Sequence, residues 1–214
     1  MKIIKPSYEI LTPISDGGIK ELQHIEKIGR VCYKSEDRIT DDGESAKKFV
    51  KMLISNGHEA MIEHSSLSVK FVVDRGVSHE LVRHRIASFA QESTRYCNYS
   101  KDKFGNEITV IEPCFWNEGT GFYECWKVSC EQSERYYFEL LNGGATPQQA
   151  RTVLPNSLKT EITITANYRE WRNFFKLRTA EASHPQMREV TIPLLKELKT
   201  LIPIIFDDIE VKDE

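Results

Sequence analysis

The stretch Arg83–Tyr96, RHRIASFAQESTRY, gathers side chains suited to binding a negatively charged ligand. It holds three arginines, a histidine and three aliphatic hydroxyl groups. Guanidinium groups bind phosphate and carboxylate oxygens through paired N–H donors, and Ser93 and Thr94 add hydroxyl donors. The whole chain has a formal net charge of −3, so this positive charge is local. The pattern predicts a site for a small anion and argues against general nucleic-acid binding, which needs a broad basic surface.

The alternative, that these arginines only form a solvated helix face, is less consistent with the spacing. Gly76 and Ser78 are expected to open a helix that runs into the cluster, with Ser78 as its N-cap. On that helix Arg83 and Arg85 would lie about 200° apart, so one solvated face cannot hold both. Residues 88–96 are expected to form a loop with free hydroxyls, because serine and threonine favour turns.

Further arginines follow at Arg151, Arg169 and Arg178, whereas lysine often supplies the charge elsewhere, as at Lys47 and Lys48. The arginine side chain is a planar fork that binds an oxyanion in two places or stacks on a flat ring. The distribution therefore indicates a ligand that is both anionic and planar.

RHRIAS, followed by SFAQESTRY, resembles the RHRxxS signature of the flavin-dependent thymidylate synthases. GHE at 57–59 and Glu63-His64 lie upstream, and RTVLPNS, TANYREWRNFFKLR and SHPQ follow in the order of that family, so the resemblance covers about 57–186. It implies an enzyme that makes dTMP from dUMP. Methylenetetrahydrofolate would supply the carbon, FAD would carry the hydride, and NADPH would reduce the flavin.

The resemblance also implies a role for individual residues. Arg178 matches an arginine that polarises the uracil ring and favours ionisation at N3, and His58 matches a histidine beside the flavin; these two are the expected catalytic residues. The positions that match flavin contacts are Arg83, His84, Arg85, Gln91, Asn167, Arg169 and Asn173. The positions expected to bind dUMP are Glu80, Arg83, Gln91, Glu92, Ser93, Thr94, Arg95, Arg151 and Arg178.

The chain departs from the commoner family pattern at two of these positions. Glu80 stands where many members have glutamine, and Gln91 stands where many have glutamate. An amide and a carboxylate are similar in shape but differ in charge and donors. A phosphate would repel Glu80, so this carboxylate is expected to pair with Arg83 or His84 one helical turn away.

Two other functions remain open at the level of sequence. Pro113-Cys114 resembles the Pro-Cys nucleophile of the cysteine-dependent thymidylate synthases, although VIEPCFWN lacks the neighbouring residues of that site; a buried, inert Cys114 is expected. A module that binds nucleotide or flavin without catalysis is the second alternative.

No spacing of histidines and cysteines predicts a metal site. His64 is a candidate core histidine, and Ser93 is expected to bind an anion because no histidine–carboxylate pair is evident to activate it.

Length and composition describe an ordinary globular protein. The chain has 214 residues, of which 40% are hydrophobic and 29% charged. Five cysteines without CxxC pairing argue against a disulfide framework, and no apolar run suits a membrane span or signal peptide, so a cytoplasmic location is expected. The resemblance implies a homotetramer with shared active sites that binds small molecules, neither nucleic acid nor membrane.

The predicted fold class is α+β, with a largely antiparallel or mixed sheet flanked by helices in one domain over residues 1–214. Alternating apolar residues predict strands at 1–11 (broken at Pro6), 66–74, 107–113 and 160–168. Helical periodicity, glycines and capping residues predict helices at 18–33, 44–57, 122–141, 169–178 and 185–202, with another starting at Pro147. In the first of these, one apolar stripe is expected to comprise Ile19, Leu22, Ile25, Ile28 and Val31. The end of the chain, 207–214, reads as an acidic tail.

Overall fold

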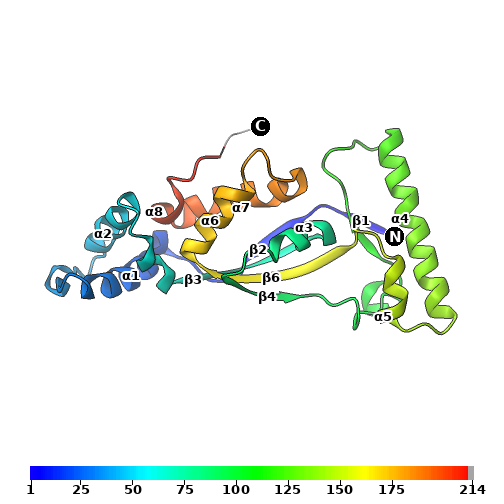
Figure 1. The fold of residues 1–214 in the computed structure, drawn as a ribbon, viewed down its shortest axis with the longest axis horizontal. Coiled ribbons are helices and arrows are strands. Elements are labelled where there is room, and N and C mark those ends of the chain that lie inside the picture. The colour runs from blue at the N-terminus through cyan, green and yellow to red at the C-terminus, as the bar shows by residue number, and fades with distance from the viewer. Residues whose placement is uncertain (212–214) are drawn as a thin grey trace. The chain divides into compact units, whose positions relative to one another are not determined.

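The structure is a computed structural model that describes residues 1–211 (Figure 1). Its contacts group the chain into two compact units. Unit 1 contains Met1–Tyr8, Lys70–Arg83 and Phe89–Thr163, and unit 2 contains Glu9–Val69, His84–Ser88 and the chain from Ile164 onward. A single domain over 1–214 stays a prediction, and positions 212–214 of the expected acidic tail lie outside the described residues.

Two sheets confirm the α+β prediction. The larger one is antiparallel and has the order β2-β3-β6-β4, formed by Ser7–Ile10, Ser66–Asp74, Lys159–Asn167 and Ala87–Gln91. The smaller one pairs β1 (Lys2–Ile4) in parallel with β5 (Thr109–Ile111), with Lys2 opposite Thr109. The break between β1 and β2 falls at Pro6, as predicted.

The two long strands follow the alternation that predicted them. In β3 the side chains of Leu67, Val69, Phe71 and Val73 are buried, and in β6 those of Ile162, Ile164 and Ala166 are buried. Side chains in a strand point alternately to opposite faces, so every second apolar residue reaches the core. Both strands belong partly to unit 1 and partly to unit 2.

Unit 1 contains α3 (Arg75–Leu81), α4 (Gly121–Asn142) and α5 (Pro147–Ala150). Short 3-10 turns η4 and η5 cover Asp102–Phe104 and Arg151–Val153. The Thr120 hydroxyl caps α4, and Thr146 forms a capping box with Gln149 at the start of α5, which has only four residues. The predicted starts at 122 and 147 are therefore confirmed within one residue. The buried core of this unit comprises Tyr99, Ile108, Val110, Cys130, Tyr137, Ala150 and Leu158.

Unit 2 contains α1 (Ile19–Val31), α2 (Glu44–Ser55), α6 (Tyr168–Arg178), α7 (Pro185–Leu201) and α8 (Pro203–Phe206). The 3-10 turns η1, η2 and η3 cover Asp16–Gly18, Glu36–Arg38 and Glu59–His64. Of these helices only α8 was not predicted. Helix α6 packs against α7 and α8 (Figure 1), and Trp171 and Phe175 on α6 are fully buried.

One predicted helical stripe is partly wrong. On α1, Leu22 and Ile25 are buried, but Val31 at the end of the expected stripe is 53% exposed. Glu26 and Arg30 are buried beside them, and Arg30 donates twice to Glu26 Oε1, at 2.7 and 3.0 Å. The ion pair satisfies both charges, which lets two polar side chains occupy the inner face.

The expected helix through the arginine cluster is also wrong. The N-cap of α3 is Asp74, whose carboxylate accepts from the Val77 amide at 2.7 Å, and not Ser78. The helix ends at Leu81, so Arg83 and Arg85 lie in the turn and loop that follow it. The loop expected at 88–96 begins with strand β4, because residues 87–91 join the sheet beside β6.

Among residues 1–211, no helix is long and apolar enough to cross a membrane.

Candidate functional site

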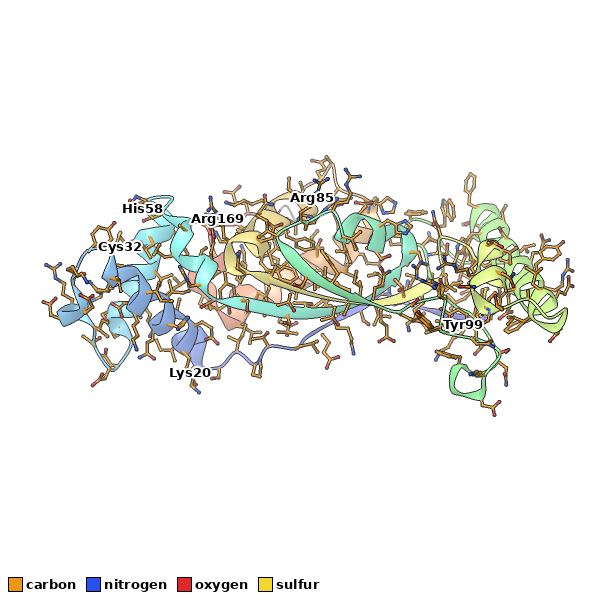
Figure 2. All side chains as sticks on the ribbon, turned by 60° about the horizontal axis from the view of Figure 1, so that its bottom comes forward. Lys20, Cys32, His58, Arg85, Tyr99 and Arg169 are labelled. Carbon is orange, nitrogen blue, oxygen red and sulfur yellow. The ribbon has the colours of Figure 1, made fainter. Side chains whose placement is uncertain are left out.

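A hollow of about 470 Å³ in unit 2 brings together three of the residues that match flavin contacts, Asn167, Arg169 and Asn173. They lie at the start of α6, and Figure 2 labels Arg169 there. The other lining residues are Glu59, Glu63, Ile86, Glu170 and Lys176.

Local contacts fix these side chains. Asn167 is the N-cap of α6, and its Oδ1 accepts from the Glu170 amide at 2.8 Å, which leaves its side-chain NH₂ group as a donor. Arg169 Nη1 donates to Glu63 Oε1 at 2.5 Å. The Asn173 amide nitrogen lies 3.4 Å from Glu170 Oε2. The hollow therefore presents amide and guanidinium donors at the first two turns of one helix.

His84 connects Glu170 and Arg178 within the same unit. Arg178 Nε donates to His84 Nε2 at 3.0 Å, and His84 Nδ1 lies 3.0 Å from Glu170 Oε1. A guanidinium nitrogen can only donate, so Nε2 must accept and the ring proton must sit on Nδ1. Phe174 packs against the imidazole edge-on, with ring centroids 4.9 Å apart. These contacts assign His84 as a neutral ring with one defined tautomer.

Burial and charge both favour this neutral form. His84 is buried, with 7% of its surface exposed, and its pKa is lowered mainly by this burial, with a further contribution from the positive charge of Arg178. The hydrogen bond to Glu170 acts in the opposite direction but does not overcome the burial. His84 was one of two expected partners of Glu80, the other being Arg83; the carboxylate that His84 contacts in the structure is Glu170.

Two other predicted residues of unit 2 lie outside this arrangement. His58 is exposed and lines a separate hollow of about 340 Å³ with Gly29, Cys32, Tyr33, Leu53, Ala60 and Met61. Figure 2 labels His58 and Cys32 close together. Arg85 is exposed on the loop before β4, where Figure 2 labels it.

Unit 1 holds the residues that match dUMP contacts, apart from Arg178. Residues 93–97 form a tight turn, in which the Tyr96 and Cys97 amides donate to the Ser93 carbonyl at 3.1 and 2.9 Å. Ser93 Oγ accepts from the Arg95 amide at 3.3 Å, and Arg151 Nη1 donates to Thr94 Oγ1, also at 3.3 Å. The turn thus collects two hydroxyls and the guanidinium of Arg151, while Arg95 itself is exposed.

The residues just before this turn are anchored inside unit 1. Glu92 Oε1 accepts from Tyr99 Oη at 3.0 Å, and Glu92 Oε2 accepts from Lys159 Nζ at 3.0 Å. Gln91 Nε2 donates to Ser78 Oγ at 3.0 Å and lies 3.3 Å from Thr160 Oγ1. Both carboxylate oxygens of Glu92 are therefore engaged by residues that the sequence did not single out, and they tie the turn to β6.

The remaining predicted positions differ in exposure. Glu80 lies in α3, and its carbonyl accepts from the Arg83 amide at 3.2 Å; the Arg83 side chain is exposed.

Two expectations are wrong: Cys114 is exposed, because it follows β5 on a surface loop, and His64 is exposed at the end of η3. None of the five cysteines, all within the described part, forms a disulfide. No three His, Cys, Asp or Glu side chains within 1–211 group together in a way that could hold a metal ion.

Sequence reasoning missed Glu170, although a signal was present. Glu170, Phe174 and Arg178 recur at intervals of four residues, which places them on one face of a helix. All three contact His84. The spacing could have indicated the shared face, but the partner is 86 residues away in the chain and only the fold supplies it.

Comparison with known proteins finds a matching family model and several related enzymes. Residues 19–204 match the family model described as "Thymidylate synthase complementing protein". The chain is 30% identical over 204 residues to a flavin-dependent thymidylate synthase from Corynebacterium glutamicum, a match that covers 88% of this chain and 79% of the relative. The chain belongs to the flavin-dependent thymidylate synthase family.

Two other flavin-dependent thymidylate synthases are similarly related. The one from Mycolicibacterium gilvum is 31% identical over 203 residues, and the one from Mycobacterium avium is 30% identical over 203 residues; each match covers 87% of this chain and 79% of the relative. Membership confirms the resemblance drawn from RHRIAS and confirms that the chain is an enzyme of a flavoprotein family.

The residues of unit 2 fit the flavin that the family name implies. A flavin ring offers carbonyl and ring-nitrogen acceptors around a flat apolar surface, and the hollow offers amide and guanidinium donors beside Ile86, which is 70% exposed. Its carboxylates are engaged: Glu59 pairs with Arg172, Glu63 with Arg169, and Glu170 with His84. The volume lies within the range of small-molecule sites, about 300–1,000 Å³.

Proposed function

We propose that this enzyme converts dUMP to dTMP with methylenetetrahydrofolate as carbon donor, FAD as cofactor and NADPH as reductant, without an enzyme nucleophile. The observation that carries the proposal is the contact of Arg178 with the buried, neutral His84 of the RHR motif. Arg178, which the family resemblance assigns to uracil activation, is the last residue of the helix that carries Arg169 and Asn173, and the contact with His84 orients its guanidinium.

Ser93, Thr94, Arg95 and Arg151 would bind the phosphate of dUMP. A phosphate dianion accepts hydrogen bonds from hydroxyls, backbone amides and guanidinium groups, and charged acceptors strengthen each bond. The 3.3 Å contact between Arg151 and Thr94 supports this role, since it holds one guanidinium beside the hydroxyls of the turn.

Arg178 would stabilise negative charge on the uracil ring. Carbon 5 of uracil is a poor nucleophile, and a fixed positive charge beside O2 and N3 makes the ring more electron-rich as the new bond forms. Arginine suits this role because its guanidinium stays protonated even when it is partly buried.

Asn167, Arg169 and Asn173 would hold and orient FAD through their N–H groups. When bound and reduced by NADPH, FAD supplies the hydride that turns the transferred methylene group into a methyl group. Ile86 would cover part of the flat ring surface, because its side chain is largely exposed in the hollow.

The direct test is dTMP formation by the purified flavin-loaded enzyme, with each of dUMP, methylenetetrahydrofolate and NADPH omitted in turn. The proposal expects dTMP only when all three are present, and it expects the Cys114→Ala variant to keep most of the activity. A Cys114→Ala enzyme that binds dUMP but forms no dTMP would favour the thiolate route. Absence of turnover in the wild-type enzyme would favour the silent binding module.

We also propose a homotetramer in the cytoplasm. An exposed aromatic cluster of unit 1 supports the assembly: Phe115, Trp116 and Phe122 are 46%, 36% and 71% exposed, and their ring centroids lie 4.9 and 6.0 Å apart in sequence order. Exposed aromatic patches commonly mark protein–protein contacts. Three exposed cysteines, Cys32, Cys114 and Cys125, suit a reducing compartment.

A further inference from the structure

We infer that Glu170 is a positioning residue for Arg178 and acts through the tautomer of His84, an inference that rests on the role proposed for Arg178. The chain of contacts runs from Glu170 Oε1 to His84 Nδ1 at 3.0 Å and from His84 Nε2 to Arg178 Nε at 3.0 Å. All three residues belong to unit 2.

The tautomer matters because Arg178 Nε is a donor that requires an acceptor. A neutral imidazole has one N–H and one bare nitrogen, and the partner of one nitrogen decides which form is present. The carboxylate of Glu170 accepts from Nδ1–H and thereby directs the lone pair of Nε2 toward Arg178. Without Glu170, the Nε2–H tautomer would place two N–H groups against each other, and Arg178 would lose its alignment while keeping its charge.

The helix geometry makes Glu170 able to hold the ring. Glu170, Phe174 and Arg178 follow one another at intervals of four on α6, so they span about 12 Å along one face. The imidazole lies edge-on against Phe174, the middle residue, and contacts the other two with its two nitrogens. The ring is therefore clamped at three points.

Glu170 is itself fixed in place. Its side chain is 11% exposed, its backbone amide donates to Asn167, and the amide of Asn173 lies 3.4 Å from its second oxygen. A carboxylate with few alternative orientations transmits its position to the ring.

The first test measures the tautomer directly in the flavin-free protein. Nitrogen-15 NMR of histidine-labelled enzyme distinguishes protonated from bare ring nitrogens, and the His84 signals are those missing from His84→Asn. We expect Nδ1 protonated and Nε2 bare in the wild type and in Glu170→Gln, whose amide oxygen still accepts. We expect a mixture of tautomers in Glu170→Ala. Glu63→Gln, in the same hollow but paired with Arg169, should keep the wild-type pattern.

The second test separates positioning from binding in the loaded enzyme. Glu170→Ala should lower kcat for dTMP formation about tenfold or more while changing the KM for dUMP much less, since misalignment of a catalytic group acts mainly on the rate. Glu170→Gln should recover most of this loss.

Several results would overturn the inference. A wild-type ring protonated on Nε2 would do so without any variant, as would an unchanged tautomer in a folded Glu170→Ala protein. A kcat equal to wild type in that variant would do the same. The tautomer measurement requires no turnover, so its failure is distinct from failure of the proposed reaction.

Discussion

At the scale of single residues, the proposed chemistry depends on arginines that neutral groups orient. Arg178 donates to the neutral ring of His84, and Arg151 donates to the hydroxyl of Thr94. Such partners fix the direction of a guanidinium without removing its charge. Replacement of Arg178 or His84 removes one member of the first pair, and replacement of Ser93 removes the hydroxyl beside the second.

Replacement of Arg178 by alanine should suppress dTMP formation while flavin stays bound. Loss of one group that stabilises developing charge costs on the order of 3 kcal/mol of barrier, or about 10²-fold in rate. The flavin should remain because Asn167, Arg169 and Asn173 are unchanged. Turnover at saturating dUMP and the flavin absorbance of the same sample measure both effects. Near-normal turnover would remove Arg178 from the mechanism.

Ser93→Ala should weaken dUMP binding more than it lowers the maximal rate. A hydrogen bond to a charged phosphate contributes roughly 1.5–3 kcal/mol, so the dissociation constant should rise tens-fold. Ser88→Ala is the matched control, since Ser88 is an exposed serine on β4, and it should leave the constant unchanged. Intact affinity with no single turnover in Ser93→Ala would instead indicate a nucleophilic serine.

The buried His84 should make stability depend on pH. The unfolded ring has its usual pKa of 6.5, and burial lowers the pKa in the folded chain. Between these values the unfolded chain binds more protons, so the stabilising contribution is present above pH 6.5 and is lost as the pH falls through the folded pKa. Urea unfolding between about pH 5 and 7.5 should show that the free energy of unfolding falls more steeply with decreasing pH for wild type than for His84→Asn. Equal slopes for wild type and His84→Asn would contradict this.

At the scale of elements, the sequence predicted best where local pattern and tertiary context agree. Strands β3 and β6 alternate apolar and polar residues, and α6 carries an N-cap and a helical stripe, so these were predicted nearly to the residue. Residues 83–91 were misread as helix and loop, because Asp74 caps α3 earlier than expected and β4 depends on pairing with β6. Contacts between distant elements, such as Glu170 with His84, have no local signature.

The attachment of α6 to the segment after α8 should contribute measurably to stability. Arg172 is 1% exposed and donates to both carboxylate oxygens of Asp208, at 2.6 and 2.7 Å. Asp208→Asn removes one charge and one acceptor from a buried guanidinium, so the free energy of unfolding should fall by about 1–3 kcal/mol. Asp207→Asn, one residue away and exposed, should stay within about 0.5 kcal/mol of wild type. Equal denaturation curves for the two variants would contradict the role of Asp208.

At the scale of the whole molecule, the predicted site residues fall into two groups. Unit 2 holds His84, Asn167, Arg169, Asn173 and Arg178, and unit 1 holds the Ser93–Arg95 turn with Arg151. The family resemblance assigns the unit 1 group to the nucleotide. It assigns the unit 2 group to the flavin, apart from Arg178, which it assigns to the uracil ring. No local pattern shows which residues anchor the turn, since Glu92 finds Tyr99 and Lys159 only in the folded chain.

The proposed assembly gives a prediction at this scale. Native mass spectrometry should find a species of about four times the 24.7 kDa chain. Charged substitutions at Trp116 and Phe122 should shift it toward smaller species, because a charge buried in an interface without a partner is unfavourable. A wild-type monomer would contradict the tetramer and leave the exposed aromatic cluster without this explanation.

The proposed reductive methylation of dUMP through a bound flavin can be followed in a single anaerobic experiment. The purified protein should show flavin absorbance, and NADPH should bleach it. Addition of dUMP and methylenetetrahydrofolate should then restore the oxidised spectrum with one dTMP formed per flavin, in wild type and in Cys114→Ala alike. A protein without flavin absorbance, or dTMP formed at the same rate when the flavin stays oxidised, would rule out the proposed flavin-dependent reaction.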